Sequence, residues 1–179
     1  SHWYMPGQKI EAGAEPEWIN HPNRLHHAMR YKDQLWAACC SAGFHVVDVA
    51  DISTPRTIGS YNYHPPFPNT THTALRVPFK VGGRDVAVVI DEQHAHHKGQ
   101  PHAFMWVFDV SDLQNITPLS TYHVSEADSP WGEVPEGRFG AHQFQEHMSS
   151  TLVYATWFSG GLRIVDIADP LLPAEKGFF

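Results

Sequence analysis

The sequence repeats one strand-and-turn pattern three times, and this repetition constrains the fold more than any other feature. The copies are Phe44–Asp51 (FHVVDVAD), Met105–Asp112 (MWVFDVSD) and Leu162–Asp169 (LRIVDIAD). Their first aspartates, which are Asp48, Asp109 and Asp166, are 61 and 57 residues apart. Blade repeats of β-propellers are commonly about 40 to 50 residues long, so this spacing indicates loop insertions.

Each copy belongs to a unit of four predicted strands. Apolar runs precede the copies at residues 35–40, 85–90 and 151–158, and runs that open with histidine precede those at 26–29, 72–75 and 142–145. A proline-containing turn and a short apolar strand follow each copy, at 57–61, 119–122 and 174–179. The aspartates can accept backbone N–H bonds, and the prolines of these turns, Pro55, Pro118 and Pro173, oppose further pairing. Four antiparallel strands repeated radially are typical of a propeller blade.

The repeat predicts an all-β propeller with three four-stranded blades, at residues 24–63, 69–124 and 138–179. Residues 1–23 lack strand alternation and are predicted to be an arm or the remnant of a preceding blade. Closed propellers use about 4 to 8 blades, so three leave a ring open. We therefore expect either a fragment of a longer protein with a larger ring, or a homodimer whose two copies complete six blades.

Charge and composition exclude some classes of binding partner. The net charge is −7 and the 12 Lys and Arg residues are scattered, which argues against nucleic acid. No apolar run approaches the length of a membrane-spanning helix, so no membrane partner is expected. No signal peptide is visible, and the adjacent Cys39 and Cys40 cannot bridge without strain, which leaves the compartment of a soluble protein open and favours the cytoplasm only slightly.

Histidines recur at equivalent places in the predicted blades. His26 or His27, His72 and His142 begin the first strand of each unit, which is the innermost strand of a propeller blade. They should therefore meet at one end of the central channel. Converging imidazoles are the usual ligands of a divalent transition metal such as Zn, Cu, Fe or Mn. A hydrogen-bonded core role for each histidine is the simpler alternative.

Acidic residues are expected at the same end of the channel. The loop after the second strand of the middle blade emerges there and brings Asp91 and Glu92, whereas Glu146 follows the histidine strand of the last blade. Asp91, Glu92 and Glu146 are therefore candidates for a catalytic general base, a further ligand or a residue that orients a ligand. Gln143, next to His142, should point to the opposite side of its strand.

Several spaced motifs resemble the bacterial LVIVD-repeat β-propeller family. They are Asn69–Pro78, Val89–Glu92, Ala141–Gln143 and Leu162–Ile167. The resemblance covers residues 24–179 and implies a propeller fold, but it implies no particular reaction. Polar residues recur in the family at the positions of His27, His72, Asp91, Glu92, His142, Gln143 and Glu146. The chain departs from the family at Cys39-Cys40 and in the histidine-rich loop 93–102.

Other conspicuous residues have structural explanations. The loop 93–102 contains His94, His96, His97 and His102, but its Gly, Lys and Pro are typical of a solvated insertion. The adjacent cysteines are expected to be small buried hydrophobes. Trp36, Trp106 and Trp157 should pack blades, whereas Trp131 falls in a long loop and could line a substrate entrance.

Two functions of different kinds are compatible with the sequence. The first is a metal-dependent enzyme, of oxidoreductase or lyase type, that acts on a small molecule at the channel mouth. The second is a non-catalytic scaffold whose rim binds another protein. The sequence holds no nucleophile elbow, phosphate loop or HExxH motif, which disfavours hydrolases of those kinds.

Overall fold

The computed structural model describes residues 2–5, 24–95, 99–125 and 138–179, which form three four-stranded antiparallel sheets and no helix. The first sheet contains β1 (His27–Tyr31), β2 (Gln34–Ala38), β3 (Phe44–Asp48) and β4 (Arg56–Tyr61). The second contains β5 (Thr70–Val81), β6 (Arg84–Glu92), β7 (Met105–Asp109) and β8 (Thr117–Tyr122). The third contains β9 (Ala141–Phe144), β10 (Leu152–Trp157), β11 (Gly161–Asp166) and β12 (Ala174–Phe178). Strands pair in chain order within each sheet, which confirms the predicted propeller blades.

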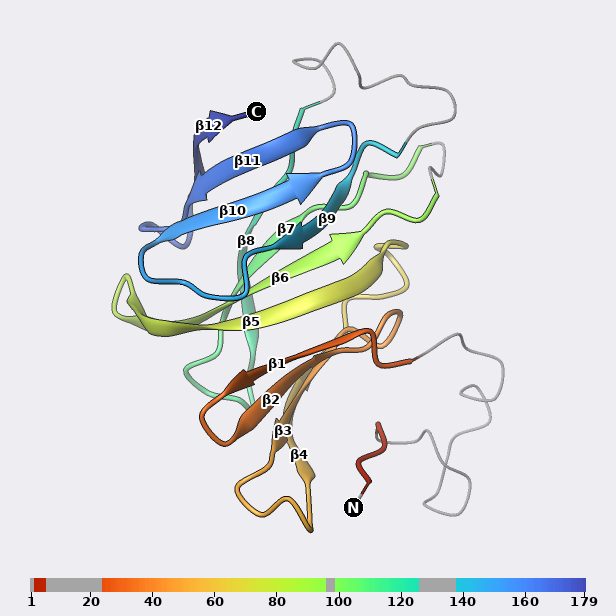
Figure 1. Cartoon of the computed structure of the whole chain (residues 1–179), viewed down its shortest axis with the longest axis vertical. Coiled ribbons are helices and arrows are strands. Elements are labelled where there is room, and N and C mark those ends of the chain that lie inside the picture. The colour runs from red at the N-terminus through yellow and green to blue at the C-terminus, as the bar shows by residue number, and fades with distance from the viewer. Residues whose placement is uncertain (1, 6–23, 96–98, 126–137) are drawn as a thin grey trace.

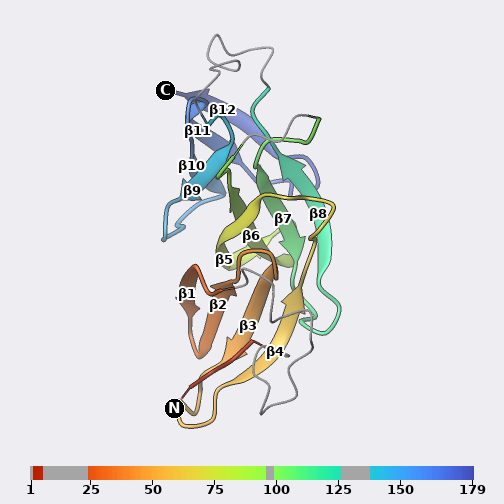
Figure 2. The same ribbon diagram turned by 90° about the vertical axis from the view of Figure 1, so that its right-hand side faces the viewer.

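The first strands of the three sheets lie next to one another. Strand β1 packs beside β5, and β9 packs beside both β5 and β6 (Figure 1). The later strands of each sheet run away from this line, as the side view of the three sheets shows (Figure 2). The residues that begin β1, β5 and β9 are therefore brought together by the topology. None of the described elements is a helix that could span a membrane.

The middle blade is buried on both faces because a blade packs against each of them. All five residues of Val86–Ile90 in β6 are completely buried, so this strand is a continuous apolar run without alternation. Strand β10 of the third blade shows the contrasting pattern. Its Val153, Ala155 and Trp157 are buried while Tyr154 and Thr156 are exposed, as expected for a sheet with one covered face.

Aromatic side chains join the first blade to the second. The Phe108 ring of β7 lies 5.2 Å from the ring of Phe44 and 5.1 Å from that of Tyr61, between centroids. Phe44 also stacks on Trp36 within the first blade. Offset and edge contacts of this kind add to the stability gained by burying the rings themselves.

The repeated aspartates end their strands as predicted. Asp48, Asp109 and Asp166 each accept a hydrogen bond from the backbone N–H two residues later, over 3.0, 2.9 and 2.9 Å. In the first repeat this N–H bond and the Arg56 guanidinium lower the pKa of the Asp48 carboxyl. The same turn chemistry in three blades explains why the motif is repeated.

One boundary differs from the prediction. The sequence predicts Pro118 in the turn before β8, but β8 begins at Thr117 and includes Pro118, which pairs with Phe108. Strand β8 is the outer edge of its sheet. Proline is tolerated there because an edge strand has one side without ladder bonds, and the pairing register shifts at this point.

Residues 2–5 cover part of the first blade. Trp3 and Met5 pack against Ala37, Cys39 and Ala42, and the Trp3 indole donates a hydrogen bond to Thr57 Oγ1 over 3.1 Å. Cys39 and Cys40 are both free and buried, as expected for small apolar side chains. The rest of the predicted arm, 6–23, lies outside the described residues.

Candidate metal centre

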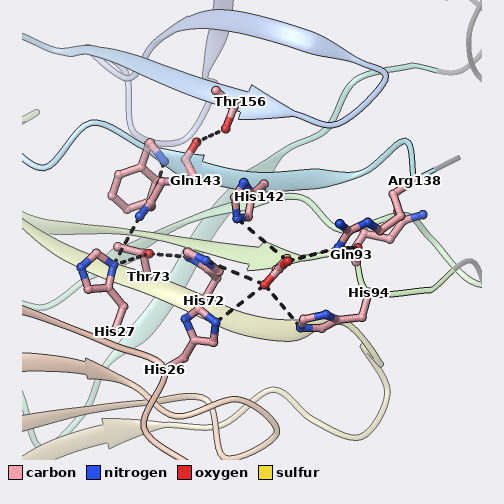
Figure 3. A network of polar contacts seen from close by, with 12 residues as sticks. His26, His27, His72, Thr73, Gln93, His94, Arg138, His142, Gln143 and Thr156 are labelled. Atoms are coloured by element: carbon pink, nitrogen blue, oxygen red, sulfur yellow. Dashed lines mark hydrogen bonds and ion pairs between the residues drawn. The ribbon is translucent and has the colours of Figure 1, made fainter.

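The Glu92 carboxylate, at the end of β6, is the centre of a cluster of imidazoles. The Nε2 atoms of His26, His72 and His94 lie 3.7, 3.8 and 3.3 Å from its Oε2 atom. The Nε2 atom of His142 lies 3.9 Å from Oε1. Figure 3 shows these four rings directed at one carboxylate. The Glu92 side chain is only 10% exposed, so the carboxylate is largely shielded from water.

The four histidines come from separate segments that the topology gathers. His26 immediately precedes β1, where its N–H donates to the Ala38 carbonyl. His72 and His142 are on the inner strands β5 and β9, and His94 follows β6. The structure therefore brings together His26, His72 and His142 at the ends of the inner strands.

Three of the four contacts to Glu92 are too long to be hydrogen bonds. Distances of 3.7 to 3.9 Å exceed the usual N···O range, whereas the 3.3 Å contact of His94 lies near its upper end. Two ligands bound about 2.1 Å from one metal lie roughly 3.4 Å apart at tetrahedral angles. The ligand atoms of His26, His72 and Glu92 all lie within 4.8 Å of one another, so the most widely separated of them would have to move closer together to bind one ion.

A chain of hydrogen bonds fixes the proton positions on the neighbouring His27. The Gln143 Oε1 atom accepts a bond from the Phe144 N–H over 3.0 Å, so the Nε2 amide of Gln143 is the group that faces His27 Nδ1, over 3.3 Å. Because an amide only donates from nitrogen, His27 Nδ1 must be an acceptor. The proton of a neutral His27 is then on Nε2, which faces Glu146 Oε1 at 3.6 Å.

The Thr73 hydroxyl lies between His27 and His72, so the position of the proton on His27 affects that on His72. Its Oγ1 atom lies 3.0 Å from His27 Nδ1 and 2.7 Å from His72 Nδ1 (Figure 3). The single lone pair of His27 Nδ1 then faces both the Gln143 amide and the Thr73 hydroxyl; when Thr73 gives its one proton to it, Thr73 accepts from His72 Nδ1–H. In this arrangement neutral His72 presents an unprotonated Nε2 lone pair to the Glu92 carboxylate.

Burial keeps His72 neutral. Loss of hydration lowers the pKa of His72 to about 3, and the neighbouring imidazoles His26 and His142 contribute in the same direction. Desolvation also lowers the pKa of His26. Two acceptors, the His72 lone pair and a carboxylate, thus face each other without a proton between them. A cation placed between them would bond to both.

Two of the predicted site residues lie at the edge of the cluster. His27 turns its ring towards Thr73, Gln143 and Glu146. The Glu146 side chain is 59% exposed, and its described ion pair is with His27. His27 and Glu146 therefore lie beside the histidines around Glu92, and His27 is connected to His72 through the Thr73 hydroxyl.

Asp91 does not join the imidazoles. Successive residues of a strand face opposite sides, so Asp91 points away from the cluster while Glu92 points into it. It is 1% exposed, accepts a hydrogen bond from the Tyr63 hydroxyl, and lies 3.3 Å from the Trp106 indole nitrogen. Burial raises the pKa of Asp91 to about 7, although these two bonds oppose the shift. The sequence places both acids at the channel, and the pleat separates them.

The described histidines of the loop 93–102 also differ in what they contact. His94 reaches Glu92, whereas the His102 Nδ1 atom lies 2.6 Å from the buried amide oxygen of Gln93. Residues 96 and 97, and Trp131 as a possible entrance residue, lie outside the described residues.

Thr73 and Arg138 are functional candidates that sequence reasoning missed. Thr73 follows His72 directly, so a hydroxyl next to a candidate histidine was visible in the sequence. The hydrogen bonds that it makes to His27 and His72 were not. Arg138, whose Nη1 atom lies 3.3 Å from Glu92 Oε1, carried no signal because it comes from a loop remote in sequence.

Comparison with known proteins agrees with the repeat found in the sequence. The LVIVD repeat matches residues 36–63 and 152–179, which are parts of the first and third blades. No curated protein matches the chain. The matched segments contain β3 and β11, the strands that end in the repeated aspartates. Two segments of the chain are therefore similar to the LVIVD repeat, and its three four-stranded sheets are those of β-propeller blades.

Proposed function

We propose that the cluster around Glu92 binds one divalent transition metal, held by His26 Nε2, His72 Nε2 and the Glu92 carboxylate. The observation that carries this proposal is the buried pair of facing acceptors, His72 Nε2 and Glu92 Oε2, 3.8 Å apart. His142 and His94 are close enough to add further ligands. Histidine ligands typically donate their other ring N–H to an outer oxygen, as His72 Nδ1 would to the Thr73 hydroxyl.

The ligand set limits the identity of the metal. Imidazole suits Zn, Cu and Fe, and a carboxylate also accepts Mn. Two histidines and one carboxylate with open positions are shared by non-haem Fe(II) oxygenases and by catalytic Zn sites. Such an ion would act on a small molecule as a Lewis acid or a redox centre. The residues of this chain would hold the ion and restrict access of water to it.

Elemental analysis of the protein, purified without a histidine tag, tests this proposal. We expect about one equivalent of a transition metal per chain, which chelation removes and reloading restores. His72→Gln should lose it. His123, an exposed histidine after β8, provides the matched control, because His123→Gln should keep the metal. Equal metal content in the two variants, or none in the unchanged protein, would favour a non-catalytic scaffold.

The hydroxyl of Thr73 should matter to the metal although it is not a ligand. Thr73→Val keeps the shape of the side chain but removes the bond that orients His72. We expect metal affinity to fall roughly 10- to 100-fold, the usual effect of losing an outer partner. Thr73→Ser should restore it. Competition with a chelator of known affinity measures both variants, and equal affinities for valine and serine would show that the hydroxyl has no such role.

A further inference from the structure

Arg138 brings a guanidinium group to the same carboxylate as the imidazoles. Its Nη1 atom lies 3.3 Å from Glu92 Oε1 and donates to the Gln93 carbonyl over 3.4 Å. The guanidinium carbon lies 3.9 Å from the centroid of the Phe158 ring, and that ring also stacks with His142 at 5.0 Å. Phe158 therefore fixes the plane of the guanidinium beside a candidate ligand.

One edge of this guanidinium is available to a ligand. Both polar contacts of Arg138 in the described part of the chain use Nη1, and its side chain is 42% exposed. With respect to those residues, the Nε and Nη2 atoms are free to donate. Two parallel donors of this kind match the two oxygens of a carboxylate, which a lysine ammonium does not. Figure 3 shows Arg138 beside Gln93, on the far side of the cluster from His26 and His27.

The charge of the site favours an anion once a metal is present. Glu146 contacts His27 rather than the imidazoles around Glu92. A divalent ion and Arg138 would then face one carboxylate, Glu92, which leaves the centre with net positive charge. A phosphate group normally meets several cations or a helix N-terminus, and the described site offers one arginine. A monoanion with planar oxygens fits this arrangement better.

We infer that Arg138 forms a carboxylate-binding subsite, and that the small molecule recognised at the channel mouth carries a carboxylate group. This inference rests on the proposed metal site. One carboxylate oxygen would approach the metal while Arg138 holds the group from its free edge. Arg138 is thus a specificity-determining residue rather than a metal ligand.

Anion titrations of the full chain loaded with Co²⁺ test the subsite. The visible spectrum of the ion reports on ligands that enter its coordination shell. We expect acetate to change the spectrum and acetamide, a neutral molecule of the same shape, to bind much more weakly. Arg138→Gln should weaken acetate binding about tenfold or more, the size expected for losing charge-assisted hydrogen bonds. Because it removes a cation beside Glu92, it should not weaken Co²⁺ binding.

Two further variants make the result specific. Arg138→Lys keeps the charge and should give intermediate acetate affinity, which also guards against a folding defect in the glutamine variant. Arg56→Gln, at a surface arginine paired with Asp48, should bind acetate as the unchanged protein does. Equal acetate affinity in all four proteins would overturn the subsite alone. Failure of the unchanged protein to take up Co²⁺ would contradict the metal site and the subsite together.

Discussion

Glu92→Gln is expected to abolish tight metal binding. Glutamine keeps the shape of the side chain but removes the negative charge that faces His26 and His72. Loss of a charged ligand should weaken metal affinity on the order of a thousandfold, or about 4 kcal/mol. Glu146→Gln is the matched control, because Glu146 is exposed and contacts His27 rather than the imidazoles around Glu92. Its effect on affinity should be no more than about tenfold.

The same substitution should not destabilise the metal-free protein. Without metal, a nearly buried carboxylate lies 3.8 Å from the lone pair of His72, which costs free energy, and its ion pair with the partly exposed Arg138 offsets only part of this cost. A glutamine amide can donate to that lone pair. We therefore expect metal-free Glu92→Gln to unfold in denaturant at the same concentration as the unchanged protein, or at a higher one. A large loss of stability would mean that Glu92 has a structural rather than a metal-binding role.

The stability of the chain should depend on pH through His45, a residue far in sequence from the cluster histidines of β5 and β9. His45 is 7% exposed on β3, its ring packs edge-on against Trp3, and neither ring nitrogen has a hydrogen-bond partner among the described residues. The nearby Cys39 thiol stays neutral because burial raises its pKa to about 12. Burial lowers the pKa of His45 to about 4.

The direction of this pH dependence follows because His45 is neutral in the native protein. In the unfolded chain the imidazole titrates near 6.5, so the native state is fully favoured above that pH. As the pH falls from 6.5 to about 4, the unfolded chain binds a proton that native His45 does not, and about 3 kcal/mol of stability is lost. Below pH 4 this contribution is constant.

Comparison of two pH series measures this effect. His45→Phe cannot titrate, so its free energy of unfolding should fall about 3 kcal/mol less than that of the unchanged protein between pH 7 and pH 4. Any cost in stability from the larger phenylalanine ring is the same at every pH, so it does not affect the comparison of how the two free energies of unfolding change with pH. His123→Gln, at an exposed position, should leave the slope unchanged. Parallel slopes for His45→Phe and the unchanged protein would show that His45 is not held neutral by burial.

The fold was predictable because its information is local and repeated. The three aspartate-ended strands and their turns depend on neighbouring residues, such as Asp48 and the N–H of Ala50, so the pattern is visible in sequence. The inner-strand histidines followed from the same repeat, since the topology places the starts of β1, β5 and β9 side by side.

The details of the site depend on information that is not local. Asp91 and Glu92 are adjacent and chemically alike, and only the pleat of β6 decides which one meets the imidazoles. His26 and His27 were equally good candidates in sequence. The structure turns His26 to Glu92 and His27 to Thr73, Gln143 and Glu146. Arg138 reaches the site from a different blade than Glu92, so no spacing rule could have found it.

The most direct test of the central claim is a crystal structure of the metal-loaded protein with anomalous scattering recorded at the absorption edge of the metal. The account predicts one strong anomalous peak, about 2.0 to 2.3 Å from His26 Nε2, His72 Nε2 and a Glu92 oxygen. A structure with no peak in this cluster, or with its main peak on other histidines and the Glu92 carboxylate bonded only to protein, would contradict it.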